Sequence, residues 1–217
     1  MFNYITFNTA SEILCFLTAV ICLSGNKNNV WRLFIPYLFV TVFAEITGIY
    51  LRNQNQNNQW PYNILLVFQI LFPGLIFKQL LKDYIKSNVI IISGTALLML
   101  LFIYETAKHG FLRFNNTTYS VMCMLYVLYS LYYFYLLLNA DDHVVLKYSA
   151  KFWWAAGTLL FCFGSTVVNV FRGLLSGLII GDHNLTYYIY SMLNMILYSC
   201  WSYSFICRKW LTTTSGV

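Results

Sequence analysis

Long apolar stretches separated by short polar segments make up nearly the whole chain. A helix needs roughly 20 mostly apolar residues to cross the hydrocarbon core of a bilayer. The pattern predicts an all-α integral membrane protein, a seven-transmembrane-helix bundle, in which residues 1–217 form a single polytopic membrane domain. The expected helices span residues 9–24, 31–51, 61–81, 87–104, 118–139, 152–178 and 186–207.

Local signals refine several of these helices. The segment Thr9-Ala-Ser-Glu12 fits a capping box, so Glu12 is expected to bind exposed backbone amides at a helix start. Pro36 predicts a bend in the second helix, and Pro73 predicts a kink midway along the third. The apolar run of the sixth helix is longer than a perpendicular span needs, so that helix must tilt, kink at its glycines or break near its end.

The composition supports the same class. Only 9% of residues are charged and 59% are hydrophobic, whereas a soluble domain is about 25% charged. The 13 Lys and Arg against 7 Asp and Glu give a net charge of +6, but no basic tract or arginine-aromatic face predicts nucleic-acid binding. The lipid bilayer is the expected partner, and the basic excess indicates the charge bias of membrane loops.

The distribution of Lys and Arg predicts the orientation. Cytoplasmic loops of membrane proteins are enriched in basic residues. With the N-terminus outside, only Arg52, Lys108, Arg113 and Arg172 face outward. The inner side then carries Lys27, Arg32, Lys78, Lys82, Lys86, Lys147, Lys151, Arg208 and Lys209. The count favours an external N-terminus and a cytoplasmic C-terminus.

Cysteine and histidine positions predict no metal site and no cofactor. The 6 cysteines fall inside or at the end of apolar runs, without a CxxC pair, and indicate packing residues. The 3 histidines lie in separate loops, so local spacing assembles no ligand set.

Five polar residues are predicted to form a cluster in the outer half of the membrane. Glu45, the only acidic residue placed well inside an apolar segment, lies about 9 Å from the outer helix end, and Gln69 and Asn194 lie about 12 Å deep. Asn169 and Arg172 share one face of the sixth helix. A charge facing lipid costs at least ~2.5 kcal/mol, so these faces are expected to turn inward and meet.

The cluster allows two interpretations. In the first, it forms an outward-facing pocket in which Glu45 and Arg172 make an ion pair or contact a small polar ligand. In the second, the two residues form a structural clamp and satisfy each other, helped by neighbouring amides. Glu45 in a protonated form, donating a hydrogen bond, is compatible with both.

Tyrosines follow the fifth helix at regular spacing. Tyr119, Tyr126 and Tyr133 are seven residues apart, with Tyr129 beside them, and Tyr198 lies on the polar face of the last helix. Tyr126, Tyr129, Tyr133 and Tyr198 are candidates for the aromatic lining of a cavity. The alternative is helix packing, with the hydroxyl groups satisfied across the bundle.

A weak internal repeat runs through the chain. YNILLVFQILF (62–72) resembles YYIYSMLNMIL (187–197), which places Gln69 opposite Asn194. Helices one to three and five to seven would then be parallel halves with helix four as a linker. This three-plus-one-plus-three layout is similar to that of SWEET-type sugar carriers and PQ-loop proteins, although the Pro-Gln dipeptide of the latter is absent.

A second resemblance rests on the pattern AEITGIYL, WPYNILLVFQ, KFWWAAGTLLF and LNMILYSC. It resembles small uncharacterised seven-span membrane proteins of the Bacteroidota type. The resemblance implies a bacterial inner-membrane location and no particular activity.

Three functions remain open from the sequence. The first is a sensor that binds a small polar ligand and passes the signal to a cytoplasmic partner, and the second is a small-solute carrier. The third is a non-catalytic assembly subunit that contacts a membrane protein through the GxxxG segment Gly173–Gly177. An enzyme is least expected, because Glu45 has no second acid-base group predicted beside it.

Overall fold

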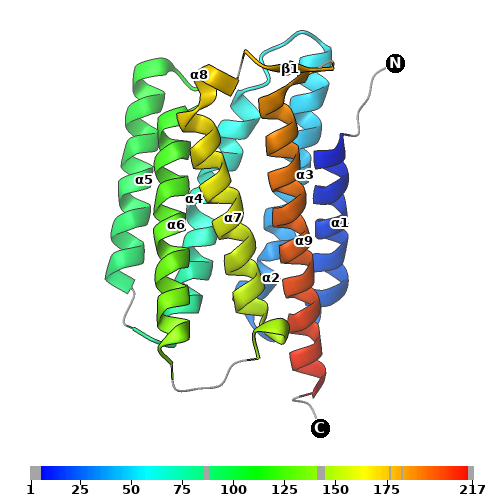
Figure 1. Cartoon of the computed structure of the whole chain (residues 1–217), viewed down its shortest axis with the longest axis vertical. Helices are drawn as coiled ribbons and strands as arrows, with labels where there is room; N and C mark the ends of the chain where they lie inside the picture. Colours follow the sequence, from blue (N-terminus) through cyan, green and yellow to red (C-terminus); the bar gives the residue numbers. More distant parts are fainter. Residues whose placement is uncertain (1–5, 86–87, 141–144, 176, 182, 215–217) are drawn as a thin grey trace.

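The computed structural model describes residues 6–85, 88–140, 145–175, 177–181 and 183–214. Its long helices run side by side along the molecule, and α1 begins at the end opposite to the one where the last helix finishes (Figure 1). These helices are α1 (Phe7–Leu23), α3 (Phe34–Asn53), α4 (Trp60–Leu81), α5 (Asn88–His109), α6 (Asn116–Leu138), α7 (Ala150–Val170) and α9 (Leu185–Thr214).

Short elements connect some of the long helices. At the lower end in Figure 1, α2 (Asn29–Arg32) precedes α3 and the 3-10 helix η1 (Leu146–Tyr148) precedes α7. At the upper end lie α8 (Arg172–Leu175) and a two-stranded antiparallel hairpin. The hairpin pairs β1 (Ile179–Ile180) with β2 (His183–Asn184).

The helical membrane class is confirmed at the level of length and composition. Within the described residues, 5 helical stretches are long and apolar enough to cross a membrane. They are Asn29–Asn53, Trp60–Leu81, Asn88–His109, Asn116–Leu138 and Ala150–Val170. The apolar α1 is shorter, at 17 residues, and α9 is longer but rich in Tyr, Ser and Thr.

Six helices form a closed ring. Contacts join α1 to α3, α3 to α4, α4 to α6, α6 to α7, α7 to α9 and α9 back to α1. The remaining long helix, α5, packs outside on α4 and α6, and only 28% of its most apolar window is buried, against 56% for α4. The fourth long helix of the chain therefore stands apart from the ring.

Two predicted helices are interrupted in the structure. One break lies beside a proline, and the other lies in an apolar segment that is longer than a membrane span needs. Pro36 has no N–H to donate to the carbonyl of Arg32, and the expected bend takes the form of a break at Leu33, between α2 and α3. The prediction of one helix over 152–178 is wrong at its end, because α7 stops at Val170. The sequence left three alternatives for this long segment: a tilt, a kink at its glycines or a break near its end. The structure shows the break.

Close approach of α7 and α9 depends on glycines that the sequence analysis did not single out. A methyl group at Gly157 would lie 2.7 Å from Cys200 Cβ, and one at Gly164 would lie 2.5 Å from Leu193 Cδ2. In contrast, a methyl group at Gly173 would have open space around it. Gly173–Gly177 therefore sets no close helix contact inside the bundle, and its contact with a membrane partner stays a prediction.

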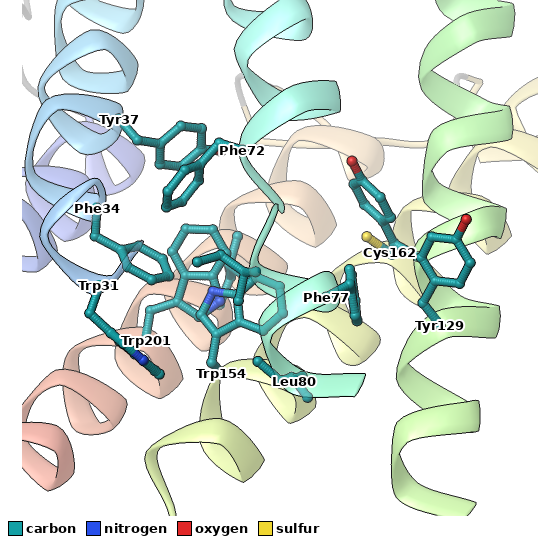
Figure 2. Packing of buried hydrophobic residues seen from close by; sticks show 14 of the residues in the cluster. Trp31, Phe34, Tyr37, Phe72, Phe77, Leu80, Tyr129, Trp154, Cys162 and Trp201 are labelled. Carbon is teal, nitrogen blue, oxygen red and sulfur yellow. The ribbon is translucent and has the colours of Figure 1, made fainter. Parts of the chain in front are cut away.

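Aromatic side chains fill the lower half of the ring (Figure 2). Phe34 packs edge-on against Phe72 with ring centroids 4.7 Å apart, and Trp154 and Trp201 stack at 5.9 Å. Phe77 closes the packing against Trp154 at 5.0 Å. These aromatic side chains come from α3, α4, α7 and α9. They therefore connect opposite sides of the helix bundle at its centre.

Candidate functional site

A cavity of about 460 Å³ occupies the upper half of the ring. Its mouth lies among Asn58, Gln59, Phe114, Asn116 and Thr186, at the upper-end connections. All six ring helices contribute to its wall, whereas α5 contributes none of the described lining residues. The deepest lining residues are Tyr37, Pro73, Thr158 and Trp201.

The aromatic packing below these residues forms the floor of the cavity. Tyr37 stacks on Phe72 at 4.4 Å and lies 6.2 Å from Trp201, and Trp201 stacks on Trp154 (Figure 2). Trp154 is fully buried and Trp201 is 4% exposed. The cavity is therefore open toward the upper connections and closed toward the lower end.

Glu45 lies on α3 in the cavity wall, as the sequence predicted for a pocket. Its Oε2 accepts a hydrogen bond of 2.9 Å from the hydroxyl group of Tyr62 on α4. The two residues meet at a tight contact between the helices, because a methyl group at Gly48 would lie 2.5 Å from the Tyr62 hydroxyl oxygen.

Glu12 is a second carboxyl group in the same cavity, and its predicted role was wrong. Thr6 caps α1 and accepts a hydrogen bond from the Thr9 N–H, so α1 begins earlier than expected and Glu12 lies beyond its first turn. Glu12 is 6% exposed, and its Oε1 accepts a hydrogen bond of 3.3 Å from Tyr198 on α9. Glu45 is only half-buried. Because Glu12 is buried more fully, Glu45 is not the only acidic residue inside the bundle.

The remaining carboxylate oxygen of Glu12 is a buried polar atom without a protein partner. Its Oε2 makes no hydrogen bond with any of the residues that the structure describes. A buried oxygen in this state costs free energy unless water or a ligand reaches it. Glu12 also lines the cavity, but this oxygen has no surface open to the space in the present arrangement of the side chain.

The three predicted amides also line the cavity. Asn169 accepts a hydrogen bond of 3.1 Å from Tyr190 and donates one of 3.4 Å to Ser120. The side chains of Gln69 on α4 and Asn194 on α9 make no hydrogen bond within the described part of the chain. Four of the five predicted cluster residues thus contribute to one space.

Arg172 is the fifth, and its predicted contact with Glu45 stays a prediction. Its backbone begins α8, just beyond the break after α7. Its side chain lies outside the described residues.

The four candidate tyrosines divide into two pairs. Tyr126 and Tyr198 line the cavity. Tyr129 and Tyr133 are not among its described lining residues: Tyr129 donates a hydrogen bond of 3.0 Å to the Ile90 carbonyl on α5, and Tyr133 packs against Tyr84 at 6.2 Å. Packing accounts for the second pair.

Tyr126 links the cavity wall to a backbone irregularity. Pro73 lies inside α4 and has no N–H to donate to the Gln69 carbonyl four residues earlier. The Tyr126 hydroxyl group lies 2.9 Å from this carbonyl and 2.9 Å from that of Ile70, within donating distance of both. A neighbouring helix thus provides the donor that the proline lacks, as proline inside a membrane helix requires.

A dense hydrogen-bond network holds the rim beside the mouth. Asn63 is fully buried, and its Nδ2 donates to the carbonyls of Phe111 and Arg113 at 2.7 and 2.8 Å. Its Oδ1 accepts a hydrogen bond of 3.1 Å from the Asn115 N–H. The first turn of α4 is therefore a structural support for the connection between α5 and α6.

Glu105 completes this rim. Its carboxylate accepts hydrogen bonds from the N–H groups of Thr117 and Thr118 and from the Thr118 hydroxyl group, at 2.8–3.0 Å. It thereby caps α6 from the neighbouring helix α5. The sequence analysis ended this helix at residue 104, whereas α5 continues to His109, and so Glu105 was placed in a loop.

Some of these residues could have been found from spacing. Glu12, Cys15, Ala19 and Leu23 are buried along one face of α1, and their separations of three and four residues are visible in the sequence. For Tyr62 we find no such signal, because its role depends on a contact with another helix.

The chemistry of the site is one of hydrogen bonds and carboxyl groups. Within the described residues, no group of three or more His, Cys, Asp or Glu is placed to hold a metal ion. In the comparisons with known proteins, no protein-family model, curated protein or solved structure matched this chain, so its function has to be argued from the geometry of the cavity.

Proposed function

We propose that this protein is a seven-span membrane protein that binds a small polar ligand in the cavity from the outer side. The spans would be the 5 long apolar stretches together with α1 and α9. An external N-terminus is supported by the basic residues, because Lys27, Arg32, Lys78, Lys82 and Lys147 lie at or near the lower-end connections and the cavity opens at the other end. A bacterial inner membrane is the proposed location.

The observation that carries the proposal is a cavity of ligand size whose wall includes the carboxyl groups of Glu12 and Glu45 and amides without partners among the described residues. A structural clamp would be expected to satisfy its own polar groups, since unmet ones are expensive away from water. Here the amides of Gln69 and Asn194 also lack partners among the described residues. The volume, about 460 Å³, falls in the range of roughly 300–1,000 Å³ typical of small-molecule sites.

Sensing is the role that we propose for this binding. The floor of packed aromatic rings supports it, because a bound ligand would press on residues of α3, α4, α7 and α9 without a passage below them. A change in this packing would reach the short basic connections at the lower end, where a cytoplasmic partner could dock. Such a signal requires the ligand to favour one arrangement of the floor over another.

A carrier is the second candidate, and one observation favours it. Pro73 interrupts the backbone bonding of α4 beside Gln69 at the floor of the cavity, and interrupted helices near mid-membrane are a feature of many carriers. The ring order, with α5 outside, is also compatible with two halves of three helices. A role as an assembly subunit, without a ligand, remains the alternative to both.

Ligand screening of the purified protein tests the binding proposal. Thermal unfolding would be followed with panels of neutral, anionic and cationic small solutes. We expect at least one solute to stabilise the wild type and to lose its effect in Asn194→Phe, which fills the cavity. Met192→Phe is the matched control, because Met192 lies on the same helix and is 65% exposed.

The outcome also separates the roles. Stabilisation that is equal in both variants, or that comes only from a co-purifying protein, would contradict ligand binding in the cavity. Uptake of the active solute into sealed vesicles would favour a carrier, whereas binding without uptake would favour a sensor.

A further inference from the structure

The cavity wall contains ionisable acids but no described basic side chain. Glu12 and Glu45 are the ionisable acids in its wall, and none of its described lining residues is Lys, Arg or His. The nearest cation along α3 is Arg52, which is exposed, and no ion pair joins it to Glu45 within the described residues. Two carboxyl groups therefore line one space whose described wall contains no cation, and Arg52 acts on Glu45 electrostatically from outside that wall.

Aromatic side chains lie beside the more buried carboxyl group, that of Glu12. Tyr198 donates its hydroxyl hydrogen bond to Glu12, and its ring lies 6.1 Å from that of Trp201. Tyr37 lies 6.2 Å from Trp201 on the other side. All three rings line the cavity and are at most 7% exposed, so they form a rigid wall beside the hydrogen-bonded pair of Tyr198 and Glu12.

This combination matches one class of ligand. A small organic cation is attracted by the faces of Trp and Tyr rings, and the attraction increases when water is excluded. A carboxylate oxygen beside the rings supplies the opposite charge that a cation needs away from water. Once ionised, the same two carboxyl groups would repel anionic solutes.

A metal ion fits the site less well. Calcium and magnesium require about six oxygen ligands at short distance, and the described residues contain no group of three acidic or metal-binding side chains. Aromatic rings supply none of these ligands. The wall formed by Tyr37, Tyr198 and Trp201 is suited to the methyl or methylene groups of an organic ammonium ion.

We infer that the cavity selects small organic cations, with an ammonium group held between the Glu12 carboxylate and the rings of Tyr37, Tyr198 and Trp201. This inference rests on the proposed function, since it names the chemical class of the ligand. It adds a selectivity that a general polar pocket lacks.

The test compares two probes of equal shape. Choline carries a quaternary ammonium group, and 3,3-dimethylbutan-1-ol has the same shape without the charge. We expect choline to bind the purified wild-type protein, measured by calorimetry and thermal unfolding, at least about tenfold more tightly than the alcohol. This comparison needs no variant and therefore does not depend on how any substitution folds.

Variants then locate the charge. Glu12→Gln should weaken choline binding by about thirtyfold or more, because the ammonium group loses a buried opposite charge. Asp83→Asn makes the same change in net charge at the lower end, where Asp83 pairs with Lys151, and should leave binding unchanged. Trp201→Phe, which keeps a weaker ring, should reduce the affinity about threefold.

Each result has a defined meaning. Equal binding of choline and the alcohol, or equal choline binding by wild type and Glu12→Gln, would overturn the cation inference and leave the cavity as a ligand site. A neutral or anionic solute that binds in the cavity when choline does not would have the same consequence. If no solute of any class binds there, both the inference and the proposed function fail.

Discussion

Two polar clusters inside this bundle handle their hydrogen bonds in opposite ways. At the rim, Asn63 forms three side-chain hydrogen bonds and Glu105 accepts three more. In the cavity, the Glu12 carboxyl group accepts one bond of 3.3 Å, and its second oxygen has no partner within the described residues. The rim residues Asn63 and Glu105 use their polar groups to hold the chain, whereas in the cavity one Glu12 oxygen and the amides of Gln69 and Asn194 have no partners among the described residues.

The difference helps to separate structural from functional polarity. Both clusters contain acids and amides that are at least partly buried, so residue type alone does not distinguish them. The number of protein partners does, because a group that the fold has already satisfied gains little from a ligand. Substitutions at the two clusters should therefore change stability by very different amounts.

The largest effect is expected at the rim. Asn63→Leu would remove three hydrogen bonds and leave two carbonyls and the Asn115 N–H without their partner. We expect the free energy of unfolding to fall by about 3 kcal/mol or more. Thermal unfolding in detergent measures this, with the exposed Gln56→Leu in the preceding connection as control. A loss as small as that of the control would remove the distinction between the clusters.

A smaller loss of stability is expected at the close contact between Gly48 and Tyr62 in the cavity wall. Gly48→Ala would place a methyl group 2.5 Å from the Tyr62 hydroxyl oxygen and push this side chain away from Glu45. Overpacking of this kind costs about 1–3 kcal/mol. Gly25→Ala is the control, because a methyl group there meets nothing within 4 Å. Equal stability of the two variants would show that Tyr62 can move freely.

The bond between Tyr126 and the proline-interrupted helix should have an intermediate effect. Tyr126→Phe would leave the Gln69 carbonyl without its donor, at a cost of about 1 kcal/mol. Pro73→Ala restores an N–H that can bond to this carbonyl, so the cost of Tyr126→Phe should shrink in the double variant. A double-mutant cycle of unfolding free energies measures the coupling, and additive effects would contradict it.

The smallest effect is expected at Glu12. Glu12→Gln removes a carboxyl group that makes one hydrogen bond, so the free energy of unfolding should change by less than about 1 kcal/mol or increase. The same denaturation experiment without ligand checks this. A loss comparable to that of Asn63→Leu would show that Glu12 is structural and would remove the contrast between rim and cavity.

The sequence by itself determined the class of the protein and most of its helices. Within a bilayer each helix must bond its own backbone, so hydropathy and length locate the apolar helices without reference to other segments. The third helix, predicted at 61–81, is observed at Trp60–Leu81, and Glu45, Gln69, Asn169 and Asn194 were found because polar groups on one helix face must avoid lipid.

Only the tertiary structure decided which of these polar groups have partners. Tyr198 reaches Glu12 across 186 positions of the chain, and Tyr126 reaches Gln69 across 57. Such pairings depend on the order of the helices around the ring, which periodicity within a single helix does not encode. For the same reason the sequence placed Tyr129 beside Tyr126 as a second candidate for the cavity lining, whereas the fold turns its hydroxyl group to the backbone of α5.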